Sequence, residues 1–324
     1  MKLLIVLPNW IGDAVMATPS IEKLIEHYKP KEITLLGTSL TLALFSRDVR
    51  FTRCIVDDSK KSSNRFKGLV QLAQKLGSHD VAVNFRNTLL SQFLLWKTQS
   101  KERFGRKTNL LSSLFLNHNI NINTKQHYVK RYAQLAQKIC NDDFKPGELK
   151  LFSKTKKHDN PTVAIVPGAA YGSAKRWYPQ KYAEVAINLA SKFDIILLGG
   201  PAEADITQDI VTLLKAKQIT NYQDLAGKTS IEELVDIIAG VDLFIGGDSG
   251  PMHIAAAMQV PTVAIYGPTN EKESYPWANK QHIVIRKDLE CAPCAKRTCP
   301  LKHHECMKDL GSDLVLSAVE RLIK

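Results

Sequence analysis

Short apolar runs that alternate with amphipathic stretches constrain the fold of this chain more than any other feature. In the first half, the runs KLLIVLP, EITLLG, RCIVDD and DVAVNF are rich in Leu, Ile and Val and end in turn or capping residues, as buried strands do. Helical patterns lie between them, at residues 14–28 and 65–76. Between residues 89 and 140 the pattern weakens: NTLLSQFLLW and QHYVKRYAQLAQKIC favour helices, and RKTNLLSSLF is ambiguous. Strands that alternate with helices predict βαβ units and a parallel sheet.

The alternation stops at a polar segment, residues 150–161, and then resumes. The runs TVAIVPG, DIILLGG, VDLFIGGDSG, PTVAIYG and HIVIRK predict strands, and helices are predicted near residues 179–192, 204–217, 230–239, 251–258 and 313–323. A chain of 324 residues is long enough for two domains of about 150 residues each. We therefore predict an α/β protein of two Rossmann-like, doubly wound domains that face a central cleft, at residues 1–156 and 157–324.

Targeting signals are not evident in the sequence. No run approaches the ~18 apolar residues of a membrane-spanning helix. The opening MKLLIVLPNW has five consecutive apolar residues before Pro8, too few for the core of a signal peptide. These features predict a soluble, cytoplasmic protein.

The charge is distributed unevenly between the two halves. The net charge is +12, and residues 1–156 carry 26 Lys and Arg against 12 Asp and Glu, whereas the remainder carries 18 against 20. A positive field confined to one domain attracts an anionic partner such as a nucleic acid, an anionic membrane surface or a polyanionic substrate. Solubility alone is an equally good explanation of the excess.

The segment GGDSGPMH follows a predicted buried strand and opens a helical pattern. Asp248 or Ser249 suits the N-cap, Gly250 allows a sharp turn, and Pro251 suits the first helical turn. Free backbone N–H groups at such a helix start form a cradle for a pyrophosphate, and His253 lies close enough along the chain to contribute. An ordinary capped turn remains the alternative.

A second loop, PGAAYGSAKRWYP, also follows a predicted strand. Small residues such as Gly168 and Ser173 allow a ligand to approach the backbone closely, and Lys175 adds a positive charge. The loop lacks the GK[ST] of a P-loop, and the chain has no GxGxxG after a strand, so neither a Walker site nor a dinucleotide fingerprint is predicted. A solvated surface loop is the alternative interpretation.

Near the start, the segment LPNWIGDAVMATP places Asp13 where the first strand enters a helix. An N-cap is one role for an aspartate in this position. A carboxylate that projects from the edge of the sheet and acts as a general base is the other.

Four of the six cysteines lie within CAPCAKRTCPLKHHEC, at Cys291, Cys294, Cys299 and Cys306. With two histidines close by, the spacing suits a zinc ion or an iron–sulfur cluster. Buried reduced thiols without a metal are the simpler interpretation, and we predict no bound metal.

Four motifs, GDAVMATP, PGAAYGSAKRWYP, GGDSGPMH and CAPCAKRTCPLKHHECM, together resemble those of the bacterial lipopolysaccharide heptosyltransferases, glycosyltransferase family 9. The resemblance covers nearly the whole chain, and the motifs occur in the order found in that family. It implies a GT-B fold and an inverting, metal-independent transfer of heptose without a cofactor. Ala169, Ala170 and Tyr171 stand where members that add the first heptose have paired threonines, which favours the members that add the second.

The resemblance also implies roles for individual residues. Asp13 matches the proposed catalytic base, and Lys175 matches the lysine that binds the donor phosphates and assists their departure. Glu203 matches an acidic residue at the nucleotide ribose. The loop that binds the diphosphate and the heptose comprises Asp248, Ser249, Gly250, Pro251 and His253, with Gly168 and Ser173 completing the donor set. For the acceptor we single out Asn9, Trp10, Arg86 and Asn87, although solvated loop residues are an equal alternative.

Within this family the donor is ADP-heptose and the acceptor is the heptosyl-Kdo-lipid A inner core. Such an acceptor carries carboxylates and phosphates, which would account for the positive first half and implies contact with the inner leaflet of the inner membrane. Transfer of the first heptose to Kdo, or of another nucleotide sugar, remains an alternative. A nucleic-acid-binding protein is disfavoured, because the chain has no helix-turn-helix or RNP motif.

Overall fold

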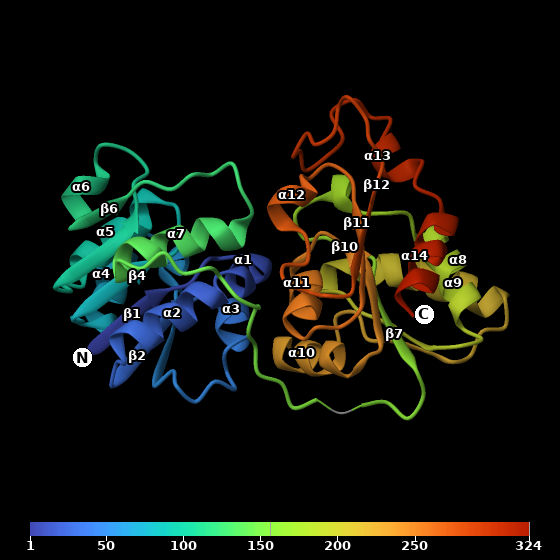
Figure 1. The fold of residues 1–324 in the computed structure, drawn as a ribbon, viewed down its shortest axis with the longest axis horizontal. Helices are drawn as coiled ribbons and strands as arrows, with labels where there is room; N and C mark the ends of the chain where they lie inside the picture. Colours follow the sequence, from blue (N-terminus) through green and yellow to red (C-terminus); the bar gives the residue numbers. More distant parts are fainter. Residues whose placement is uncertain (156, 324) are drawn as a thin grey trace. The chain divides into compact units, whose positions relative to one another are not determined.

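The computed structural model describes residues 1–155 and 157–323 and divides into two compact units, residues 1–152 and 153–324 (Figure 1). Residue 156, the expected end of the first domain, lies outside the described residues. Each unit contains one parallel sheet of six strands with helices around it. The α/β class and the doubly wound topology of both halves are therefore confirmed.

In the first unit, the strands follow the spatial order β3-β2-β1-β4-β5-β6. The chain moves outward from β1 to β3 and then returns to place β4 beside β1, so the connections reverse direction between these two strands. The strands are β1 (Lys2–Val6), β2 (Glu32–Gly37), β3 (Arg53–Val56), β4 (Val81–Asn84), β5 (Glu102–Arg106) and β6 (His118–Ile120). The helices are α1 (Ile11–Met16), α2 (Thr18–Tyr28), α3 (Ser39–Ala43), α4 (Arg65–Leu76), α5 (Leu89–Lys97), α6 (Ser112–Phe115) and α7 (Tyr128–Cys140).

The second unit repeats this topology in the order β12-β11-β10-β7-β8-β9, with the reversal between β7 and β10. Its strands are β7 (Thr162–Val166), β8 (Asp194–Leu197), β9 (Tyr222–Asp224), β10 (Leu243–Gly247), β11 (Thr262–Tyr266) and β12 (His282–Arg286). Its helices are α8 (Pro179–Leu189), α9 (Ala204–Ala216), α10 (Ile231–Gly240), α11 (Gly250–Ala257), α12 (Glu271–Ser274), α13 (Glu305–Lys308) and α14 (Ser312–Leu322).

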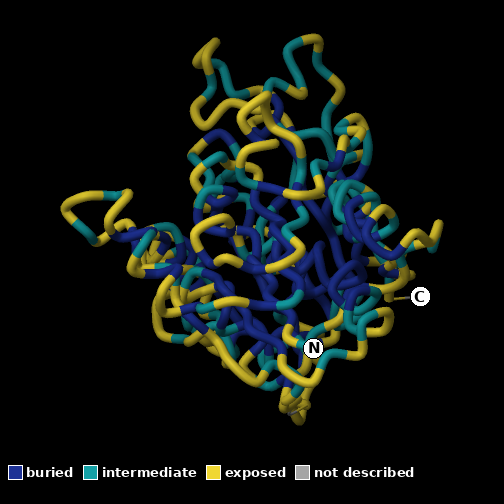
Figure 2. The backbone as a smooth tube through the Cα atoms, turned by 90° about the vertical axis from the view of Figure 1, so that its left-hand side faces the viewer, coloured by how far each residue is buried: buried dark blue, intermediate teal, exposed yellow. Residues whose placement is uncertain are grey.

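The cores explain why the apolar runs form strands. Leu4 and Val6 of β1 pack with helices α4 and α5, while Leu3 and Ile5 on the opposite face of the same strand are also fully buried. A strand covered on both faces needs a continuous apolar sequence, which is what the central runs have. Figure 2 shows buried positions gathered along the sheets and exposed positions in the connections.

Three strands, the short helices α3, α12 and α13, and the division of one helix differ from the sequence-based expectation. The pattern does not predict β5, β6 or β9, whose sequences ERFGR, HNI and YQD are polar because they lie at or next to the edge of a sheet. The helix expected at residues 14–28 is two helices, α1 and α2, which meet at Ala17. Pro19 lies in the first turn of α2, where a missing N–H costs nothing.

Among the described residues, no helix is long and apolar enough to cross a membrane.

Candidate functional site

The reversal of strand order between β7 and β10 brings two of the predicted loops together. Both strands are parallel and adjacent, so the loops that follow their carboxyl ends lie at the same edge of the sheet (Figure 1). One loop carries Lys175 in a 3-10 turn, Ser173–Lys175, and the other carries Asp248 and Ser249 before α11. This edge is where open parallel sheets bind their ligands.

Lys175 and Asp248 form a nearly buried ion pair at this edge. The Nζ atom of Lys175 lies 2.7 Å from Oδ2 of Asp248, and the two side chains are 11% and 9% exposed. Burial opposes ionisation of Asp248, but the positive charge of Lys175 and the hydrogen bonds to the carboxylate outweigh it and lower the pKa of the carboxyl. The carboxyl of Asp248 therefore stays ionised at neutral pH.

His253 lies one helical turn into α11, with Nε2 4.0 Å from Oδ1 of Asp248. Burial lowers the pKa of His253 to about 4, because the attraction of Asp248 does not compensate for the loss of water. The imidazole is therefore neutral at pH 7 and can donate one hydrogen bond and accept another.

The start of α11 presents polar atoms that no protein group satisfies. Within residues 1–155 and 157–323, the buried Oγ of Ser249 and Nδ1 of His253 have no hydrogen-bond partner. Ser249 is the N-cap of α11 in an extended conformation, and its side chain makes no capping hydrogen bond. Unsatisfied groups at the positive end of a helix dipole suit an anionic ligand.

Gly168 and Glu203 are in direct contact at the same edge. A Cβ atom added to Gly168 would lie 2.1 Å from Cδ of Glu203, so only glycine leaves room for the carboxylate. Glu203 is buried, and its Oε2 accepts a hydrogen bond of 2.8 Å from the backbone N–H of Gly200. Ser173, by contrast, is exposed on the 3-10 turn.

The lysine loop is held in place by the cysteine segment, a contact that the sequence does not predict. The N–H of Ala174 donates to the carbonyl of Arg297 at 3.0 Å, and a Cβ on Gly172 would lie 2.3 Å from that oxygen. The ring of Tyr171 contacts two cations, with Lys175 Nζ 5.3 Å and Arg297 Cζ 5.0 Å from its centre. Arg297 therefore adds positive charge beside the lysine loop. The sequence does not predict that Arg297 lies beside this loop, because more than 100 residues separate them along the chain.

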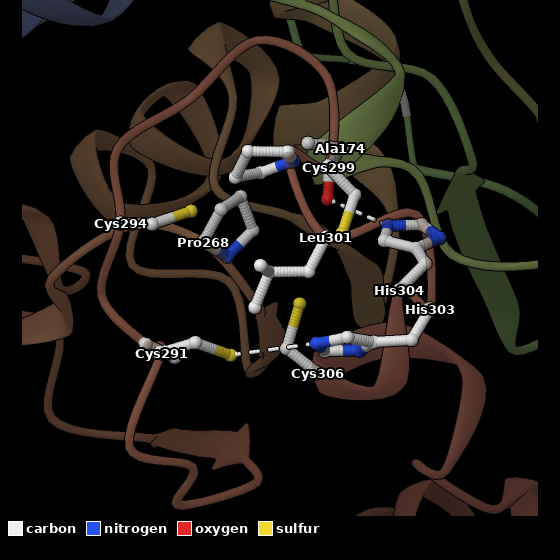
Figure 3. Close-up of a pocket in the computed structure, with 11 residues that line it drawn as sticks. Ala174, Pro268, Cys291, Cys294, Cys299, Leu301, His303, His304 and Cys306 are labelled. Atoms are coloured by element: carbon white, nitrogen blue, oxygen red, sulfur yellow. Dashed lines mark hydrogen bonds between the residues drawn. The ribbon is translucent and has the colours of Figure 1, made fainter.

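The four cysteines of this segment surround a cavity of about 40 Å³ (Figure 3). Cys291 Sγ lies 3.9 Å from Nε2 of His303, and burial, followed by the neighbouring thiols, raises the pKa of Cys306 to about 11. In the part of the chain that the structure describes, no three His, Cys, Asp or Glu side chains are placed to hold a metal ion. His304 forms a hydrogen bond with the lysine loop, with its Nε2 2.9 Å from the carbonyl oxygen of Ala174.

In the first unit, the reversal between β1 and β4 places Asp13 near the carboxyl edge of the sheet. Asp13 lies in the first turn of α1, and its Oδ1 accepts a hydrogen bond of 2.8 Å from the hydroxyl of Tyr132 on α7. Burial, and after it the charge of Asp13, raises the pKa of Tyr132 well above its ordinary value. The tyrosine therefore stays protonated and orients the carboxylate.

The acceptor candidates differ in their surroundings. Arg86 is buried, forms an ion pair with Asp57, and donates from Nε to the carbonyl of Leu7 at 2.9 Å. Asn9, Trp10 and Asn87 are exposed.

Arg65, at the start of α4, is a further candidate that the sequence does not predict. Burial lowers the pKa of Arg86, and the positive charge of Arg65 adds to this effect. Among the described residues, Nη1 of Arg65 and Nη2 of Arg86 are buried without a hydrogen-bond partner. The spacing of the two arginines in the sequence does not predict a common site, because the rest of α4 and all of β4 lie between them.

Comparison with known proteins assigns the chain to a family. The family described as "Glycosyltransferase family 9 (heptosyltransferase)" matches residues 69–305. Lipooligosaccharide heptosyltransferase 2 of Campylobacter jejuni is 35% identical, over 99% of both chains. The structure of Escherichia coli ADP-heptose lipopolysaccharide heptosyltransferase II superposes with a TM-score of 0.82 at 25% identity, covering 99% of this chain and 98% of that one. A structure of an E. coli heptosyltransferase with ADP shares the fold, with a TM-score of 0.79 at 18% identity and 99% coverage of both chains. The chain belongs to glycosyltransferase family 9, the heptosyltransferases.

Proposed function

We propose that this enzyme transfers L-glycero-D-manno-heptose from ADP-heptose to heptosyl-Kdo-lipid A, as the second heptose of the lipopolysaccharide inner core. The names of relatives that match along nearly their whole length support a second heptosyl transfer with ADP-heptose as the donor. The observation that carries the proposal is the start of α11, where a buried ion pair of Lys175 and Asp248 adjoins the unsatisfied Ser249 and His253. Such a site suits the diphosphate of a nucleotide sugar.

On the donor side, Lys175 and the N–H groups at the start of α11 bind the diphosphate. Glu203, fixed over Gly168 by the Gly200 N–H, accepts hydrogen bonds from the ribose hydroxyls. As the bond between the heptose and the diphosphate breaks, ADP leaves with the electron pair, and the same groups stabilise its growing charge. We assign the positive charge at this step to the protein, without a metal ion or a cofactor.

On the acceptor side, Asp13 removes the proton from the attacking hydroxyl, and Tyr132 holds the carboxylate in position. Attack from the face opposite the departing ADP inverts the anomeric configuration. Arg65 and Arg86 supply positive charge that attracts anionic groups of the acceptor. A lipid-linked acceptor places the enzyme at the inner leaflet of the inner membrane.

The test is to supply ADP-heptose with Kdo-lipid A that carries one heptose and to follow the product by mass spectrometry. The expected product has one additional heptose. A matched reaction uses Kdo-lipid A without heptose. If only the acceptor without heptose is extended, the enzyme is the transferase for the first heptose. If neither acceptor is extended, the proposed acceptor is refuted.

A further inference from the structure

Helices α4, α5 and α6 and the residues just before α6 expose several large apolar side chains. Leu110 is 86% exposed and Leu114 is 65% exposed. The whole set, which we name the α4–α6 patch, consists of Phe66, Leu90, Trp96, Leu110, Leu111 and Leu114. Single exposed apolar residues are ordinary on a protein surface, whereas a group of them on neighbouring elements indicates an interaction site.

Aromatic contacts connect these elements into one surface. Helix α5 packs against both α4 and α6 (Figure 1). The ring of Phe93 on α5 lies 5.6 Å from that of Phe66 on α4 and 5.7 Å from that of Phe115 on α6. Trp96 lies 5.7 Å from Phe115 as well. Phe66 and Trp96 are therefore joined through the partly buried rings of Phe93 and Phe115, and Leu114 precedes Phe115 in α6.

The segment that carries the patch is rich in positive charge. Residues 59–118 carry eleven Lys and Arg but only two Asp and Glu, so this segment holds most of the excess of the first unit. Lys67, Lys97 and Lys107 are exposed, and Nζ of Lys97 lies 4.1 Å from the centre of the Trp96 ring. Leucine and aromatic side chains surrounded by lysine and arginine are typical of surfaces that enter the interface of an anionic membrane.

We propose that the α4–α6 patch docks the enzyme onto an anionic lipid bilayer. The apolar side chains enter the headgroup region, and the lysines bind the anionic headgroups. Charge decides between a bilayer and a second copy of this chain: a symmetric dimer through the patch would place two strongly positive surfaces against each other.

The patch adjoins one residue of the proposed acceptor side, Arg65, which precedes Phe66 in the first turn of α4. A bilayer bound at the patch would therefore present its headgroups beside Arg65. This last step rests on the proposed function, whereas binding of a bilayer does not.

The experiment measures co-sedimentation of the full chain with vesicles that contain no acceptor. Vesicles of phosphatidylcholine are compared with vesicles containing about 30% phosphatidylglycerol, since each lysine or arginine gains from a negative surface. We expect binding to the anionic vesicles only. The double variant Leu110→Ser/Leu114→Ser should bind about ten-fold more weakly, because both apolar side chains are lost from the interface.

The matched control is Leu40→Ser/Val49→Ser, which changes two exposed apolar residues of the same unit outside the patch. It should bind vesicles like the wild type, and circular dichroism should show that both variants are folded. Transfer to an acceptor trimmed of its acyl chains tests the proposed function separately and should be unaffected in both variants. Equal vesicle binding by patch variant and wild type, no binding by the wild type, or a dimer in sedimentation that only the patch variant loses would each overturn the proposal.

Discussion

The two units share one topology but differ in how they carry charge and apolar surface. In the second unit, Lys175, Asp248 and His253 are buried or nearly so, and the charge of the lysine is balanced by the aspartate. The first unit instead has a large positive excess and exposes most of the large apolar residues, including the α4–α6 patch. Under the proposed function, one topology therefore serves a compact ligand held by short-range contacts in one unit and a large amphiphilic ligand attracted by surface charge in the other.

The largest expected effect separates chemistry from donor binding. Asp13→Asn should lower turnover by about 100-fold or more, because the amide cannot accept the acceptor proton, while ADP affinity stays nearly unchanged. Steady-state kinetics and calorimetric titration with ADP provide the two measurements. Asp143→Asn, which changes an exposed carboxylate of the same unit, should leave both values intact. Turnover of Asp13→Asn near that of the wild type would remove Asp13 from the mechanism.

Lys175→Ala should weaken both donor binding and turnover, each by at least about ten-fold, because the lysine meets the diphosphate before and during its departure. Titration with ADP and steady-state kinetics measure the two effects. The substitution also leaves Asp248 buried without its cation, which costs about 3–5 kcal/mol of folding stability.

Adding Asp248→Asn to this variant should recover much of the melting temperature but not ADP binding. The control Lys215→Ala removes an exposed lysine of the same unit. Donor affinity and rate equal to those of this control would show that Lys175 does not contact the donor.

Gly168→Ala tests whether the carboxylate of Glu203 must occupy its observed position. The new Cβ would displace Glu203, and we expect ADP affinity to fall about ten-fold through the loss of hydrogen bonds to a charged group. Gly147→Ala is the matched control, since a Cβ there meets no atom within 4 Å. Titration with ADP measures the effect, and unchanged affinity would argue against contact between Glu203 and the nucleotide.

A smaller effect is expected from salt, which should distinguish the two units. An increase from low to physiological ionic strength shortens the Debye length to ~8 Å and should raise the KM for the acceptor several-fold. The KM for the donor should change less, because its site is nearly buried. An acyl-trimmed acceptor keeps membrane binding out of this measurement. Equal sensitivity of both constants would contradict the division of roles between the units.

The smallest expected effect is on the stability of the folded protein at acidic pH. His253 has a pKa of about 4 in the folded protein and an ordinary value of 6.5, so protonation favours the unfolded state. This histidine costs no stability well above pH 6.5, and its cost grows as the pH falls toward 4. His253→Gln should therefore reduce the loss of melting temperature between pH 7 and about pH 4.5. His158→Gln, at an exposed histidine, should retain the wild-type slope, and a wild-type slope in His253→Gln as well would contradict the assignment.

The sequence predicts the central strands and the long helices because burial on both faces leaves a continuous apolar run, as in β1 and β10. It misses the edge strands β6 and β9, because their polar sequences HNI and YQD lack the apolar run that marks a buried strand. The same limit applies to the site. Loops after predicted strands point to Lys175 and Asp248. Arg65 becomes apparent only from its buried Nη1 without a hydrogen-bond partner among the described residues, and Arg297 only from its contact with Tyr171.

The ion pair between Lys175 and Asp248 has a consequence for selectivity among anions. Because the lysine is already neutralised, a small free anion such as inorganic phosphate gains little net attraction at the start of α11. A ligand that competes for Lys175 must also contact Ser249, His253 and Glu203 to offset the weakened pair. Under the proposed function, the arrangement would therefore favour a whole nucleotide sugar over inorganic phosphate.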